Sequence, residues 1–229
     1  MPRYRGESNA YDIANNKIYR GDLLFAWDVG DTLTGWTLSG GTLPTIALDG
    51  RINLYEASAG ANSIDAYYDI PNTMGQFYGI ANMKFIIMGD DTSTNAFAFA
   101  GQLSAYSVVT GGLCVNFNNV VSLADIRWIN SSYTGSMVSG ISAVINRGTE
   151  YTLSLIISPD KTIALLNNVK LGEIPISNKG TCPMNATQLK DHFAQTKKIH
   201  LYAGHAAGQI SHVRVRDIRV SRLVGISSM

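Results

Sequence analysis

Paired carboxylates are the first chemistry to look for, because two acidic side chains flank the glycosidic bond that most glycosidases cleave. None of the four glutamates has another carboxylate two residues away: Glu7, Glu56, Glu150 and Glu173. The nearest pair on one face of a predicted strand is Asp65 and Asp69, about 13 Å apart at ~3.4 Å per residue. Retaining or inverting hydrolysis requires about 5–9.5 Å, and no nucleophile elbow or phosphate-binding loop occurs. The sequence therefore predicts a protein that is not an enzyme.

Histidines and oxygen-rich loops are the candidate metal ligands. The histidines all lie toward the C-terminal end: His192, His200, His205 and His212. No two have the helical His-x-x-x-His spacing, and alternation along a strand predicts that His200 and His212 face solvent. The loop Gly89–Asn95 gathers the hard oxygen donors that Ca²⁺ prefers, but the same residues favour plain turns. We predict no metal and no cofactor, with calcium at this loop as the alternative.

One stretch offers the residue types that bind sugars, an aromatic ring beside planar polar side chains. It runs from residue 125 to residue 133. Its candidate ligand-binding residues are Asp125, Arg127, Trp128, Asn130 and Tyr133. The alternative is a strand whose Trp128 belongs to the core and whose following loop is merely polar.

A basic run near the C-terminus raises the question of nucleic acid. It consists of Arg214, Arg216, Arg219 and Arg222. Lysine and arginine total 18 against 17 aspartates and glutamates, so the formal net charge is only +1. Nucleic-acid affinity depends mainly on phosphate neutralisation, and no aromatic platform is interleaved with the run. We predict no nucleic-acid partner, and assign the run to a solvated face or to salt bridges with a neighbouring subunit.

These residues must be positioned by strands, because short apolar or alternating runs recur between turn residues from Leu23 onward. In the run 64–70, alternation predicts a core face of Ile64, Ala66, Tyr68 and Ile70 and an opposite face of Asp65, Tyr67 and Asp69. In the last strand, Val215 and Ile218 are out of phase. A bulge near Asp217 would restore their common face.

The predicted fold is all-β, a two-sheet antiparallel β-sandwich of the jelly-roll kind with one short helix. The helix is expected at residues 186–195, where Asn185 can cap it and Leu189 and Phe193 share a face. No linker or repeat divides the remainder. We therefore predict a single domain over residues 22–229, preceded by an extended N-terminal arm at 1–21.

The arm has too few apolar residues for a core of its own, but its larger side chains could anchor it to a partner. The predicted docking residues are Tyr4, Tyr11, Ile13, Ile18 and Tyr19. The start shows no signal peptide and no segment has membrane-spanning length, which predicts a protein made in the cytoplasm and no membrane partner. Cys114 and Cys182 lack zinc or redox spacing and are expected to be reduced.

Several stretches of the C-terminal third resemble a known fold. The hairpin Glu150–Glu173, the run Ile199–Gly204 and the closing run Gly208–Val215 are similar to the C-terminal half of a concanavalin A-like lectin/glucanase or laminin-G-like domain. The resemblance implies a jelly-roll sandwich more than any activity. The polar arm and the Gly-, Ser- and Asn-rich composition also resemble tailed-phage virion proteins that use such domains for decoration or adsorption.

The predicted function is a non-enzymatic structural or adhesion module, a phage virion decoration, tail or adsorption protein at the virion surface. Its partners would be neighbouring subunits of an oligomeric assembly. The alternative is a lectin-like, carbohydrate-binding module that recognises a cell-surface glycan through residues 125–133. A second alternative is a divergent glycoside hydrolase.

Overall fold

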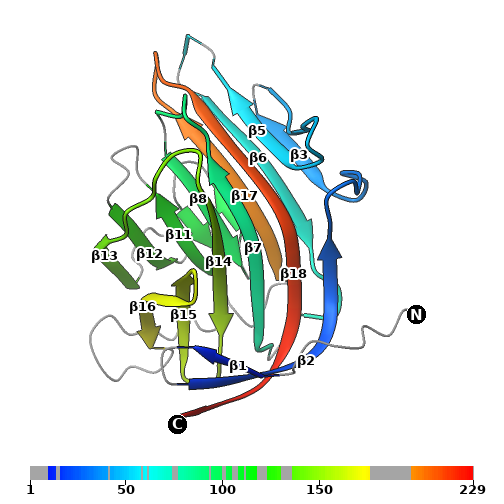
Figure 1. Ribbon diagram of the computed structural model, residues 1–229, viewed down its shortest axis with the longest axis vertical. Coiled ribbons are helices and arrows are strands. Elements are labelled where there is room, and N and C mark those ends of the chain that lie inside the picture. The colour runs from blue at the N-terminus through cyan, green and yellow to red at the C-terminus, as the bar shows by residue number, and fades with distance from the viewer. Residues whose placement is uncertain are drawn as a thin grey trace.

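Two large antiparallel β-sheets contain most of the strands in the described part of the chain (Figure 1). The computed structural model describes residues 10–13, 16–40, 42–57, 59–60, 62–73, 77–92, 94–99, 102–104, 108–110, 112–117, 123–129, 136–175 and 197–228. Within these ranges every regular element is a strand, so no helix there could cross a membrane. The predicted all-β, two-sheet sandwich is confirmed, whereas the helix expected at 186–195 lies outside the described residues.

The long C-terminal strand organises the nine-stranded sheet. In order across the sheet, its main path is β1 (Ala10–Ile13), β2 (Asn16–Trp27), β18 (Ser211–Ser228), β7 (Gly79–Ile87), β14 (Glu150–Ile157), β15 (Lys161–Leu166) and β16 (Val169–Pro175). One edge of β18 pairs with β7, and its other edge pairs first with β5 (Ile52–Glu56) and then with β2. β4 (Thr45–Ile46) pairs with β5.

The seven-stranded sheet stacks against the first (Figure 1). Its order is β13 (Ser136–Ser142), β12 (Leu123–Ile129), β11 (Gly112–Phe117), β8 (Thr94–Phe99), β17 (Lys198–His205), β6 (Asn62–Asp69) and β3 (Thr37–Gly40). A separate two-stranded pair is formed by β9 (Gln102–Ser104) and β10 (Val108–Thr110). Strands distant in sequence become neighbours, since β17 lies between β6 and β8.

Aromatic side chains join the two sheets in the core. The ring of Phe85 on β7 lies 4.8 Å from that of Phe97 on β8 and 5.2 Å from that of Phe117 on β11. All three side chains are buried. In β6, Ile64 and Ala66 are also completely buried, which confirms the alternation predicted for this strand.

A β-bulge keeps the apolar side chains of β18 on the core face. The pairing of β18 with β7 shifts register between Arg216 and Arg219, and Asp217 has a positive φ of 51°. Val215 and Ile218, on either side of Asp217, are both fully buried. The predicted bulge is confirmed, and it works because one extra residue reverses the alternation of the strand.

A second apolar cluster lies on the face of the nine-stranded sheet that is turned away from the core. It comprises Ile18, Ile80, Ile156, Ile163 and Leu165, with Leu223 packed against it. Ile80 and Ile156 alternate with the core residues Ala81 and Leu155, which places them on the opposite face. Ile18 belongs to β2, four strands from β15 along the sheet. The start of β2 must therefore bend over this outer face to reach the cluster. Figure 1 shows β1 and the start of β2 beside the lower parts of β14 and β15.

The structure differs from the predicted arm at this point, since the boundary at residue 21 falls inside β2. Pairing with β18 begins at Asn16, and β1 pairs with β2 so that Tyr11 lies opposite Ile18 and Ile13 opposite Asn16. Ile18, a predicted docking residue, is buried within its own chain because the outer face of the sheet offers it apolar neighbours. Tyr19 is exposed, and Tyr4 lies outside the described residues.

Replacing Ile18 with alanine is expected to lower the free energy of unfolding by about 2–4 kcal/mol, because it opens a cavity in a buried cluster. Tyr19→Ala, at the adjacent exposed position, is the control and should change that free energy by less than about 1 kcal/mol. Urea denaturation followed by fluorescence measures both. Equal effects of the two substitutions would contradict the packing of β2 against this sheet.

Candidate functional site

The face of the seven-stranded sheet turned away from the core carries polar side chains from the strands that build the core. In β17, Ile199 and Leu201 are fully buried in the core. Side chains alternate along a strand, so Lys198, His200 and Tyr202 project from the other face. We call this side of the sheet the polar face.

The strand register aligns the polar face in two rows across six neighbouring strands. One row consists of Ser39, Asp65, Tyr202, Ala96, Asn116 and Asp125. The next consists of Thr37, Tyr67, His200, Ala98, Cys114 and Arg127. Directly opposed positions in such rows are about 4.5–5.5 Å apart between Cβ atoms. Acidic, amide, aromatic and imidazole residues therefore occupy adjoining positions although they are far apart in sequence.

A buried histidine holds one carboxylate of the polar face. Nε2 of His200 lies 2.9 Å from Oδ1 of Asp65. Burial lowers the pKa of His200, and its hydrogen bond with Asp65 acts in the opposite direction. His200 is therefore neutral at neutral pH, and its Nε2–H donates to the carboxylate, which can only accept. The expectation that His200 faces solvent is wrong: it projects from the outer face as predicted but is only 2% exposed.

Tyr67 is fixed beside this pair by two neighbours. The ring of His200 is tilted against it with a centroid separation of 5.4 Å, and the Lys198 ammonium lies 4.7 Å from its centroid. The Lys198 ammonium also lies 2.5 Å from Oδ1 of Asp69, whose side chain is 56% exposed. The part of the polar face at β6 thus combines an aromatic ring held by two neighbours with accessible charged groups.

Three further side chains of the polar face, Tyr202, Cys114 and Asn116, are buried. A Cβ atom at Gly204 would collide with the hydroxyl of Tyr202, so the tyrosine ring extends along β17 over a position that only glycine can occupy without displacing it. The Sγ of Cys114 donates to Oδ1 of Asn116 over 3.3 Å, and both residues are buried. These side chains form the buried part of the polar face.

The register separates the sugar-binding residues predicted from the sequence. Asp125 and Arg127 occupy polar-face positions opposite Asn116 and Cys114. Trp128 lies opposite Leu113, a core residue, so its register position is on the other face of the sheet. Asn130 and Tyr133 lie outside the described residues.

Asp65, Tyr67 and His200 were not predicted as site residues. Alternation in β6 and β17 placed them on an outward face, but their pairing across the sheet has no signal in either segment alone.

The acidic loop considered for calcium is engaged with the chain itself. Oδ1 of Asp90 lies 2.7 Å from Nδ1 of His212, and Oδ2 of Asp91 accepts the backbone N–H of His212 over 2.6 Å. Among the residues with described positions, no group of three or more histidines, cysteines or carboxylates is arranged to hold a metal ion. The two described aspartates of this loop instead join it to β18.

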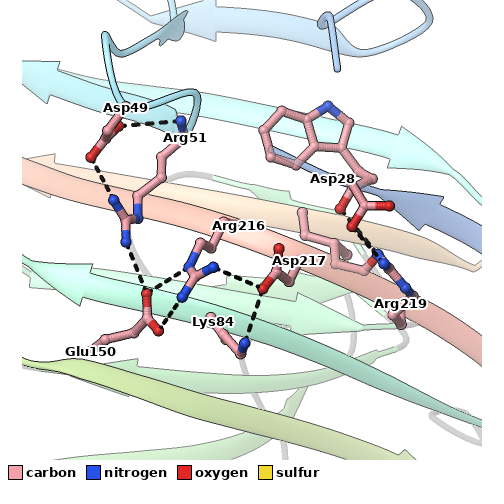
Figure 2. A network of polar contacts seen from close by, with 10 residues as sticks. Asp28, Asp49, Arg51, Lys84, Glu150, Arg216, Asp217 and Arg219 are labelled. Atoms are coloured by element: carbon pink, nitrogen blue, oxygen red, sulfur yellow. Dashed lines mark hydrogen bonds and ion pairs between the residues drawn. The ribbon is translucent and has the colours of Figure 1, made fainter. Parts of the chain in front are cut away.

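Three arginines of the basic run, Arg214, Arg216 and Arg219, form ion pairs on the outer face of the nine-stranded sheet, and Figure 2 shows those of Arg216 and Arg219. Arg216 donates two hydrogen bonds to Glu150, each 2.7 Å long, and Arg51 connects Glu150 to Asp49. Hydrogen bonding from Arg216 is the main cause that lowers the pKa of Glu150 to about 2.

The other arginines of the run also bind within the chain. Arg214 contacts Asp49 at 3.2 Å, Arg219 pairs with Asp28, and Arg222 donates to the carbonyl of Asn72. The sequence left open a solvated face or salt bridges to a neighbouring subunit, and Arg214, Arg216 and Arg219 have ion-pair partners within this chain.

Glu150→Gln is expected to lower the free energy of unfolding at pH 7 by about 1–2 kcal/mol, a figure reduced for solvent screening at this partly exposed site. A folded-state pKa below the unfolded value stabilises the protein above the unfolded pKa. In the wild type that contribution is lost as the pH falls from 4.5, the ordinary pKa of a glutamate, to about 2. Denaturation from pH 2 to 7 should show this loss in the wild type and in Asp160→Asn, a control in an exposed turn, but not in Glu150→Gln. Equal acid sensitivity of Glu150→Gln and the wild type would contradict the stabilising role of the Glu150 ion pairs.

No protein-family model and no curated protein sequence matches the chain. Among solved structures it is similar to a protein of unknown function with a galectin-like fold from Bacillus subtilis, with 13% identity, a TM-score of 0.61 and coverage of 90% of this chain and 99% of that one. It is also similar to the exoplasmic/lumenal domain of VIP36 bound to Ca²⁺ and Man3GlcNAc, with 9% identity, a TM-score of 0.61 and coverages of 89% and 92%. It is similar as well to the Crh5 transglycosylase in complex with NAG, with 13% identity, a TM-score of 0.57 and coverage of 89% of this chain and 86% of that one. At these identities the comparisons establish the fold alone, a lectin-like jelly-roll sandwich.

Proposed function

We propose that the protein is a carbohydrate-binding, lectin-like module whose ligand lies on the polar face. The observation that carries the proposal is the arrangement of Asp65, His200 and Tyr67. His200 holds Oδ1 of Asp65, while Oδ2 has no hydrogen-bond partner among the described residues. A carboxylate oxygen in this position can accept a sugar hydroxyl, and a fixed aromatic side chain beside it adds apolar contact area.

The fold supports this proposal over a structural role. The VIP36 domain, which shares the fold, has a glycan bound in its solved structure. The structural hypothesis depended on an arm that docks to a neighbour, but Ile18 is already buried against its own sheet. No observation on the structure or its relatives supports a virion setting.

Hydrolysis is the second candidate, because the Crh5 transglycosylase has a similar fold. Asp65 and Asp69 lie on one face of β6, which is a continuous strand from Asn62 to Asp69. Their spacing along this strand remains about 13 Å, longer than the ~5–9.5 Å between catalytic carboxylates. We therefore favour binding without cleavage at this pair.

Asp65→Asn is expected to weaken glycan binding at least tenfold, because it replaces a charged acceptor that His200 orients. The test is a glycan array followed by isothermal titration calorimetry with the strongest binder. Asp160→Asn, on the other sheet, should retain wild-type affinity. A wild-type protein that binds no glycan, or an Asp65→Asn variant that binds as tightly as the wild type, would contradict the proposal.

A further inference from the structure

The accessible part of the polar face is a strip along β6. His200, Tyr202 and Asn116 are buried, so a ligand cannot reach these side chains in this conformation. The side chain of Asp65 is 16% exposed and that of Asp69 56% exposed, with the half-buried Tyr67 between them. The accessible acidic and aromatic groups therefore lie along one strand, β6.

We infer that the ligand is an uncharged oligosaccharide that lies along β6 and contacts both Asp65 and Asp69, an inference that rests on the proposed function. The two carboxylates point to the same side of the strand and stand about 13 Å apart, with Tyr67 midway. A single sugar ring is too short to reach both. Successive sugars of one chain can donate hydroxyls to each carboxylate while passing over Tyr67.

The edge strand widens this strip with hydroxyl groups. Thr37 lies opposite Tyr67 and Ser39 opposite Asp65, and both β3 residues are exposed. Hydroxyl side chains can donate and accept hydrogen bonds, which matches the mixed donors and acceptors of a sugar. The strip therefore presents an acceptor, an aromatic side chain and hydroxyls on two adjacent strands.

The charges of the strip oppose an anionic ligand. It carries two carboxylates, Asp65 and Asp69, against one ammonium, and Lys198 is already engaged by Asp69 and by the ring of Tyr67. In the polar-face rows, the next cationic position is Arg127 on β12, four strands from β6. Like charges disfavour binding of sulfated or acidic sugars.

The test is an array of glucose, mannose, galactose and N-acetylglucosamine oligomers of one to five units, printed beside heparin and polysialic acid fragments. We expect neutral oligomers to bind, with at least a tenfold gain in affinity from one unit to three. Asp69→Asn should remove most of that gain without changing affinity for the single sugar, whereas Asp65→Asn should weaken both. Asp160→Asn is the control.

The outcomes distinguish this inference from the function on which it rests. Equal affinity for one unit and five, preference for the anionic fragments, or no effect of Asp69→Asn would overturn the oligosaccharide inference and leave a carbohydrate-binding protein. Binding to none of the printed sugars would overturn the proposed function as well. Folding of each variant is checked by its thermal unfolding curve, so loss of binding by an unfolded protein is not counted.

Discussion

Alternation of side chains along the strands of the seven-stranded sheet is the constraint on which the candidate site depends. Ile199 and Leu201 must face the core, and this requirement fixes His200 on the opposite side. A slip of one residue between β17 and β6 would place His200 opposite a residue of the core face and would break its bond to Asp65. The free energy of core burial therefore determines the site register as well as the fold.

The two sheets use their outer faces differently. On the nine-stranded sheet, an apolar cluster is covered by the start of β2, and arginines of β18 pair with carboxylates from neighbouring strands and loops (Figure 2). Partly exposed ion pairs contribute little stability each, so burial of Ile18 and its neighbours stabilises this surface more than the ion pairs do. The polar face of the other sheet has an accessible strip that these interactions do not occupy, which is why it is the better candidate for a ligand.

Local patterns predicted the parts of the fold that depend on neighbouring residues. Alternation assigned the two faces of β6, and the phase change in β18 located the bulge at Asp217. The Asp65–His200 pair could not be predicted in this way, because 135 residues separate its members. The fold of β2 over its own sheet likewise depends on the cluster of Ile80 and Ile156, which lies far from Ile18 in sequence. The candidate site at 125–133 contained a conflict that alternation could have exposed, since Arg127 and Trp128 are adjacent in one strand and cannot share a face.

The proposed carbohydrate site lies on the polar face at β3, β6 and β17. Backbone amide chemical-shift mapping by NMR, with the strongest-binding neutral oligosaccharide as ligand, tests this location residue by residue. We expect shifts concentrated at Thr37–Gly40, Asn62–Asp69 and Lys198–His205, with β7, β14 and β18 unchanged. Shifts confined to the nine-stranded sheet or to the loop at 89–92, or no shifts at saturating ligand, would contradict carbohydrate binding on the polar face.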